Sequence, residues 1–174
     1  MGKFIRNAKE SSESAGLLIS ILMRYPEIGA ISFNPEDESI TLSFGCTKII
    51  SDTEFLDVKN RLEACLVTYA YLERKEAPTI IMEWSRAERI SVLKTKHFLK
   101  DVTKSEIALI ISFLQDEFGD CLVKELDFIE IHEDEELILQ DEFIGYMLEH
   151  FKGAVPLNKL FAFREEGKVH LFKK

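Results

Sequence analysis

The sequence predicts an α+β fold made of two related α-β-β-α-β-β units, with antiparallel sheets and with helices packed on one face. Apolar segments with helical spacing are followed by pairs of short alternating segments, and such pairs are typical of hairpins rather than of single parallel strands. Similar apolar segments also recur in the two halves of the chain. With 174 residues, of which 46% are hydrophobic and 30% charged, the chain can bury a core.

The first unit is expected over residues 1–97, and it begins with an apolar helix around residues 16–22. Two short alternating segments follow, at residues 30–33 and 40–44. The residues between them, Asn-Pro-Glu-Asp, favour a turn, so that these segments predict a hairpin.

A second helix is predicted to begin at a capping box, in which the Ser51 hydroxyl and the Glu54 carboxylate satisfy free backbone N–H groups. Its apolar face would consist of Phe55, Val58, Leu62, Cys65, Tyr69 and Leu72. The unit closes with another hairpin, on which Ile80, Met82 and Trp84 are expected to face the core.

The second unit is expected over residues 103–174, after a linker at 98–102. It begins with a capping box of its own, formed by Thr103 and Glu106. The apolar helix that follows, around residues 108–114, repeats the first helix of the chain at a shift of 92 residues. This repetition is the first sign of a duplicated unit.

The remainder of the second unit is predicted to repeat the first. Residues 128–131 and 137–139 would form a hairpin around an acidic turn. A shorter helix would then bury Phe143, Met147 and Phe151. In the last hairpin Phe161 and Phe163 are expected to face the core, with Phe163 aligned to Trp84 at a shift of 79 residues. The alternative is that similar apolar segments recur by chance, because the alignment requires gaps.

The net charge of −9 is unevenly distributed. Residues 1–104 hold 15 basic and 15 acidic side chains, whereas residues 105–174 hold 7 basic and 16 acidic ones. Residues 86–104 carry a net charge of +4, and residues 105–142 carry −12. Most of this surface would repel a phosphate backbone, so any contact with nucleic acid must be local, and DNA is not an expected partner.

A cytoplasmic location without membrane contact is expected. The longest apolar segment near the N-terminus, residues 15–23, is about half of the roughly 20 residues that a bilayer crossing needs. The three cysteines are an odd number without the spacing of metal ligands, which suits a reducing compartment.

No sequence motif for a specific reaction or cofactor occurs, and neither a catalytic residue, a cofactor nor a metal is predicted. Cys46 follows a glycine and could be an exposed nucleophile, but a thiolate needs a nearby cation or base. The acidic run that begins at His132 could bind a hard cation, although a solvated turn is the simpler interpretation. His97, His150 and His170 lack a partner at metal-binding spacing.

Two charged segments are the candidate contact sites. The basic one combines cations with a stackable aromatic ring, Trp84, as RNA-binding surfaces do. Its residues are Arg86, Arg89, Lys94, Lys96 and His97. The acidic one consists of Glu133, Asp134, Glu135 and Glu136.

Residues 12–84, taken as α-β-β-α-β, resemble one class of KH RNA-binding domain in the order of their elements. The resemblance implies an RNA contact. KH domains clamp the nucleic-acid backbone with a G-x-x-G loop. No two of the eight glycines here stand three residues apart, so the chain is not assigned to that family.

The sequence therefore predicts a non-catalytic protein-interaction or small-ligand-binding module. The basic segment of one unit could meet the acidic segment of the other, within one molecule or across a dimer. One alternative is an RNA- or ribosome-associated protein that contacts phosphate through residues 86–104. Another is an enzyme with an unrecognised site.

Overall fold

The computed structural model describes residues 2–124 and 134–173. In chain order the elements are α1 (Gly2–Arg24), β1 (Ala30–Asn34), β2 (Ser39–Cys46), α2 (Asp52–Leu72), β3 (Ile80–Ala87), β4 (Ile90–Phe98), α3 (Lys104–Phe118), the 3-10 turn η1 (Gly119–Cys121), α4 (Asp134–Gly153), β5 (Leu160–Glu165) and β6 (Lys168–Lys173).

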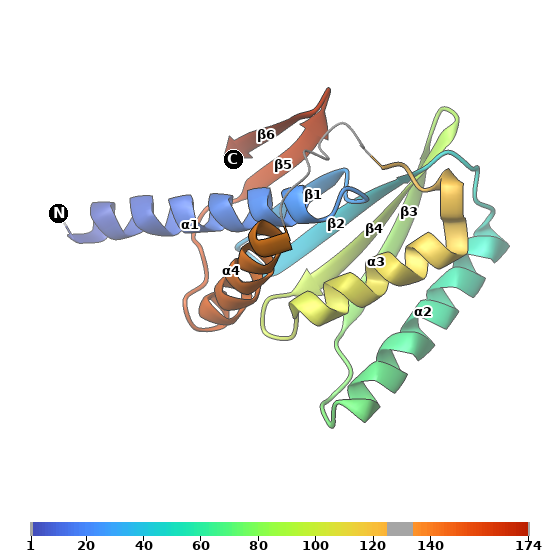
Figure 1. Ribbon diagram of the computed structural model, residues 1–174, viewed down its shortest axis with the longest axis horizontal. Coiled ribbons are helices and arrows are strands. Elements are labelled where there is room, and N and C mark those ends of the chain that lie inside the picture. The colour runs from blue at the N-terminus through green and yellow to red at the C-terminus, as the bar shows by residue number, and fades with distance from the viewer. Residues whose placement is uncertain (1, 125–133, 174) are drawn as a thin grey trace.

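The predicted α+β class is confirmed. Six strands form one antiparallel sheet in the order β3-β4-β2-β1-β5-β6, and the helices lie on one face of it (Figure 1). The element order fits a two-unit arrangement. β5 pairs directly with β1, so the strands of both predicted units join in a single continuous sheet. The division into units at residues 1–97 and 103–174 stays a prediction.

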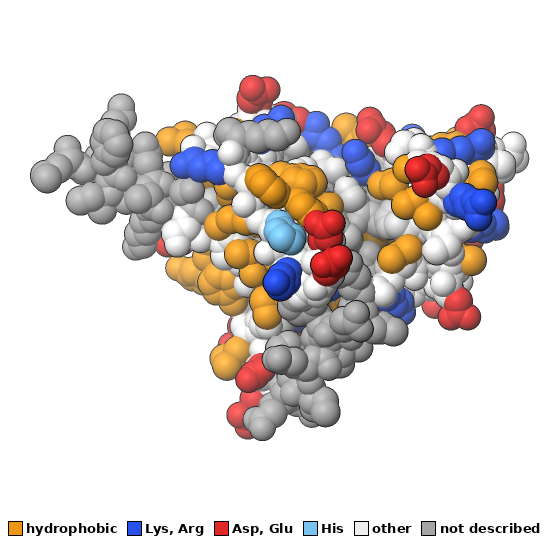
Figure 2. Space-filling view, turned by 90° about the horizontal axis from the view of Figure 1, so that it is seen from above, with side chains coloured by type: hydrophobic (Ala, Val, Ile, Leu, Met, Phe, Trp, Pro, Cys, Tyr) orange, Lys and Arg blue, Asp and Glu red, His pale blue; other side chains and the backbone are white. Residues whose placement is uncertain are grey.

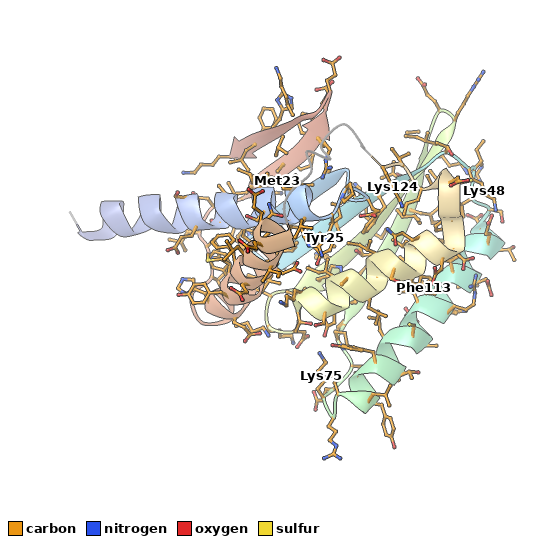
Figure 3. The ribbon with its side chains drawn as sticks, viewed as in Figure 1. Met23, Tyr25, Lys48, Lys75, Phe113 and Lys124 are labelled. Atoms are coloured by element: carbon orange, nitrogen blue, oxygen red, sulfur yellow. The ribbon has the colours of Figure 1, made fainter. Side chains whose placement is uncertain are left out.

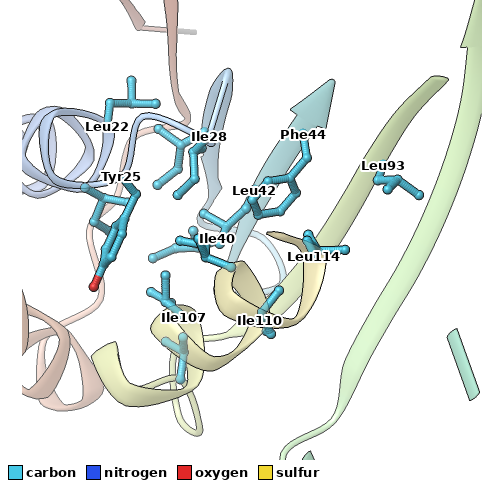
Figure 4. Packing of buried hydrophobic residues seen from close by; sticks show 14 of the residues in the cluster. Leu22, Tyr25, Ile28, Ile40, Leu42, Phe44, Leu93, Ile107, Ile110 and Leu114 are labelled. Carbon is cyan, nitrogen blue, oxygen red and sulfur yellow. The ribbon is translucent and has the colours of Figure 1, made fainter. Parts of the chain in front are cut away.

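The core lies between this sheet and the helices. Because side chains alternate along a strand, Ile31, Leu42 and Ala162, which are neighbours across three strands, all point to the helix layer and are buried there. α3 covers the middle of the sheet, where Ile110 and Leu114 meet β2 residues (Figure 4). Residues from both halves of the chain therefore share one core cluster.

The hydroxyl cap of each predicted capping box is present. The Ser51 hydroxyl accepts a hydrogen bond from the Glu54 backbone N–H at 3.1 Å, and the Thr103 hydroxyl accepts one from Glu106 N–H at 3.2 Å. Ser51 and Thr103 both have extended backbone angles, as N-cap residues require. Sequence patterns therefore located the starts of α2 and α3 correctly.

The buried face of α2 is rotated from the predicted one. Its buried residues are Val58, Leu62, Leu66 and Ala70. Leu72, which the apolar spacing placed in the core, is 72% exposed. α2 packs between α3 and the outer strand β3, so only a narrow stripe of it meets other elements and its apolar residues outside that stripe face solvent.

The predicted hairpin in the second unit is wrong at residues 137–139, which are helical and belong to α4. Its other strand, 128–131, lies outside the described residues. The short apolar segment Leu137–Leu139 favours a strand in the sequence, but three acidic residues precede it at the start of α4. Carboxylates are favourable at a helix N-terminus because they oppose the positive end of the helix dipole.

The alignment of Trp84 with Phe163 is also wrong. The β3–β4 turn is Glu88-Arg89, and the β5–β6 turn is Glu166-Gly167. Superposing the two turns requires a shift of 78 residues, one fewer than the predicted 79. With this shift Trp84 corresponds to Ala162. Both of those side chains point toward the helices, whereas Phe163 points to the opposite face of the sheet. A one-residue change of register exchanges the two faces of a strand.

Candidate interaction surface

One face of the sheet has no helix over it within residues 2–124 and 134–173; we refer to it as the open face. Strand register places two rows of side chains across all six strands on this face. The first row is Glu83, Lys94, Ser43, Ala30, Phe163 and His170. The second row is Ile81, Lys96, Thr41, Ser32, Phe161 and Phe172.

Aromatic rings gather at one end of the open face, on β5 and β6. The Phe163 ring stacks on His170 with centroids 5.1 Å apart and on Phe172 at 5.6 Å, and it also contacts Phe161 at 5.7 Å. Phe172 is 51% exposed, and the other three side chains are half-buried. These four residues form what we call the aromatic cluster.

The space-filling view shows hydrophobic side chains next to a histidine on the side of the molecule where β6 lies in Figure 1, with charged side chains beside them (Figure 2). Exposed aromatic groups of this kind are unfavourable in water and commonly mark contact surfaces.

Two lysines, Glu83, Ile81 and small side chains make up the rest of the two rows. Lys94 is exposed beside Glu83 on the neighbouring strand, while Lys96 donates a hydrogen bond to Asp37. The Lys96 ammonium and, secondly, the Ser39 hydroxyl stabilise the Asp37 carboxylate and lower its pKa. In the two rows, the central strands β1 and β2 carry only alanine, serine and threonine.

The predicted basic residues divide among three places. Lys94 and Lys96 share the open face with the aromatic cluster. Arg86 points to the helix side, where its guanidinium donates to the Ile50 carbonyl at 3.2 Å and lies 5.0 Å from the centre of the Trp84 ring. Arg89 lies in the β3–β4 turn.

His97 is inside the core. It is 2% exposed, its Nε2 is 2.8 Å from the Thr95 hydroxyl, and burial lowers its pKa to about 4. The imidazole is therefore neutral near pH 7, and neither it nor the Trp84 ring forms a surface with the lysines.

The predicted acidic segment is only partly described. Glu133 lies outside the described residues, while Asp134, Glu135 and Glu136 begin α4, so the expected turn is wrong for these three. Glu135 and Glu136 are exposed. They lie in the helix layer and not on the open face.

The sequence offers Cys46, His132 and His150 as side chains that could act in chemistry or bind a metal. Cys46 is fully buried, and that burial raises the pKa of its thiol, the opposite of what a nucleophile needs. His150 lies 3.5 Å from the Glu13 carboxylate. His132 is outside the described residues, and no group of three or more potential metal-ligating side chains occurs in the described part of the chain.

A cavity of about 560 Å³ lies where α3 ends, lined in part by Thr47, Gln115 and Lys124. Three of its polar side chains have partners within the protein. The Thr47 hydroxyl donates to the Cys121 carbonyl at 3.3 Å, and the Gln115 amide donates to Glu27. Lys124, labelled in Figure 3, lies 3.9 Å from the same Glu27 carboxylate. Thr47, Gln115 and Lys124 are therefore engaged by other groups of the protein.

Comparisons with known protein families, with curated proteins and with solved structures found no match for this chain. Among the helices that the structure describes, none combines the length and apolar character needed to span a membrane.

Sequence reasoning did not predict the aromatic cluster as a surface. Its signal was present, because Phe161 and Phe163 alternate in β5 as His170 and Phe172 do in β6. Alternation identifies two faces but not which of them is covered. The larger side chains were assigned to the core, whereas Leu160 and Ala162 occupy it.

Proposed function

We propose that this protein is a non-catalytic binding module that associates with a second copy of itself through the open face. The observation that carries the proposal is the aromatic cluster, which is partly exposed on a sheet face that no described element covers. Burying apolar surface against a partner stabilises a complex by about 25 cal/mol for each Å² removed from water.

The distribution of side chains suits a two-fold axis that lies in the interface, parallel to the strands and between β1 and β2. Such an axis would place β5 and β6 of one copy over β3 and β4 of the other. The phenylalanine rings would then face Ile81 and Lys94, combining apolar contact with attraction between an ammonium and the ring faces. Small side chains on β1 and β2 would allow close approach at the centre.

The open face is also large enough. Six strands, spaced about 4.8 Å apart and about 20 Å long, cover roughly 500 Å² on each copy. Two such faces bury about 1,000 Å² in total, which is where specific interfaces begin. The expected dimer is therefore of moderate stability, and it should respond to single substitutions.

Analytical ultracentrifugation of the full chain tests this proposal. The wild type should dimerise at micromolar concentration, and Phe172→Asp should give a monomer, because it places an unpaired charge in the interface. Leu139→Asp is the matched control, since Leu139 is 64% exposed on α4 in the helix layer. A monomeric wild type, or a dimer that only Leu139→Asp disrupts, would overturn the proposal.

The salt dependence of the dimer distinguishes two kinds of interface. Apolar association through the open face should persist as ionic strength rises. Contact between the basic segment 86–104 of one copy and the acidic segment 105–142 of another should weaken, because salt screens exposed charges. A dimer that high salt dissociates but that tolerates Phe172→Asp would support the charge-based contact instead.

Single-stranded RNA is the second candidate partner, favoured by the presence of Lys94 and Lys96 on the same face as the aromatic cluster. Bases stack on aromatic rings while cations contact phosphates. Labelled poly(U) should bind with an affinity that falls with salt, and Lys94→Ala with Lys96→Ala should reduce the salt slope by about 1.4. Arg86→Ala with Arg89→Ala should leave that slope unchanged, and equal effects of both pairs would contradict an open-face RNA site.

A further inference from the structure

A second surface, separate from the open face, lies at the outer edge of β3. This strand pairs only with β4 among the described residues, and it is at the end of the sheet. Alternate residues of an edge strand direct their backbone N–H and C=O groups outward, where another extended chain can pair with them. β3 is eight residues long and begins with Ile80, Ile81 and Met82.

The two edges of the sheet differ in what surrounds them. β6 at the other end has six residues and carries a lysine at each terminus, a feature that discourages pairing. Beside the start of β3, by contrast, a cavity of about 250 Å³ lies between this edge and the C-terminal half of α2. It is lined by Glu63, Leu66, Val67, Ala77, Pro78, Thr79 and Ile80.

The apolar groups of this cavity are partly accessible. Leu66 is buried at its base, and Val67 is 55% exposed. Leu56, Glu63 and Val67 follow one another at spacings of seven and four residues, which places them on the same side of α2. At the far end of β3, Phe55 contacts Trp84 with ring centroids 5.8 Å apart.

From this arrangement we propose that the groove between α2 and the edge of β3 binds an extended peptide with an apolar side chain. The peptide would add a strand to β3 through main-chain hydrogen bonds, and alternate side chains would face α2. One apolar side chain would enter the cavity between Leu66 and Pro78. The free edge determines that the partner is an extended chain, and the cavity determines which of its side chains are favoured.

This inference goes beyond the proposed self-association and does not depend on it. The open face and the edge of β3 are different surfaces, and substitution of Phe172 leaves Val67 and the cavity unchanged. A monomeric wild type in the ultracentrifuge would therefore leave the peptide site intact, and failure of the peptide site would leave the dimer intact.

The test begins with a phage-displayed library of random linear peptides selected on the full chain. The enriched sequence, synthesised with a fluorescent label, should carry a conserved apolar residue and bind the wild type. Val67→Arg should weaken its binding by about tenfold or more, because it places a charge at the mouth of the cavity. Val67→Ile and the distant Leu139→Arg should each change the affinity little.

Hydrogen exchange identifies where the peptide binds. Bound peptide should protect alternate amides of residues 80–87, as pairing at a strand edge requires. Failure to enrich any peptide, binding that survives Val67→Arg, or protection elsewhere would overturn the inference. If residues 80–87 become protected as the concentration of protein alone rises, and no peptide competes, the edge pairs with a second copy and the peptide site is refuted.

Discussion

At the scale of single residues, His97 shows how burial controls ionisation. Its imidazole lies among core side chains with one hydrogen-bonding contact, to Thr95, and its pKa falls from 6.5 to about 4 because burial penalises the charged form. Because His97 follows Lys96 in the sequence, both residues were predicted to belong to the basic contact site. Neighbouring residues of a strand point to opposite faces, so Lys96 reaches solvent while His97 does not.

The pH dependence of stability should report on His97. The unfolded chain takes up a proton near pH 6.5, whereas the folded protein resists protonation until about pH 4. The free energy of unfolding should therefore fall as pH decreases through this range, by about 3 kcal/mol from this group. Urea denaturation between pH 7 and 4 measures it.

His97→Gln removes this titration, so its stability should change less with pH over the same range. His150→Gln is the control, because the His150 side chain is exposed, in contrast to that of His97. An unchanged pH dependence in His97→Gln would show that the proton uptake belongs to other groups.

Substitutions of Phe44 and Phe163 test which face of the sheet packs against the core. Phe44 is fully buried under α3, so Phe44→Ala should lower the free energy of unfolding by about 3 to 5 kcal/mol. Phe163 is half-buried on the open face, and Phe163→Ala in a monomeric background such as Phe172→Asp should cost only about 1 to 2 kcal/mol. Equal losses would contradict the assignment of the two faces.

At the scale of elements, the termini of the helices follow local chemistry. A hydroxyl at the N-cap position satisfies a backbone N–H that the helix leaves unpaired, which is why α2 and α3 begin directly after Ser51 and Thr103. α4 begins instead with a run of acidic residues. Its start was not predicted, because Leu137 and Leu139 fit the period of a strand as well as part of a helical turn.

Thr103→Ala should lower the free energy of unfolding by about 1 kcal/mol, because the Glu106 N–H loses its hydroxyl acceptor. Thr103→Ser should restore most of the loss. Thr68→Ala on α2 is the control, since the Thr68 hydroxyl only bonds the Ala64 carbonyl within its own helix. Thermal denaturation of the three variants provides the comparison, and a neutral Thr103→Ala would show that the cap contributes nothing.

At the scale of the whole molecule, the two predicted units depend on each other. β5 pairs with β1, and Ile107 and Leu114 of α3 belong to the same core cluster as Ile40 of β2. The first unit alone would expose the sheet surface that α3 covers. The second alone would retain a single hairpin among its described strands, which is marginal in water.

Fragments 1–102 and 103–174 should therefore be largely unfolded when separate and should regain structure when mixed. Two-dimensional NMR of one labelled fragment, before and after the other is added, measures this directly. Well-dispersed spectra for both isolated fragments would contradict the shared core and would support two independent domains.

Local patterns in the sequence were sufficient for the α+β class, the caps of α2 and α3 and the existence of the hairpins β3–β4 and β5–β6. These features depend on residues close in the chain, whose hydrogen bonds and periodicity are set locally. The choice of core face in β5, the burial of His97 and the surface shared by Lys94 and Phe163 were decided only by the tertiary structure. The residues of a strand do not by themselves determine which of its two faces is buried. The helices that pack on one face come from distant parts of the chain, so only the tertiary structure decides it.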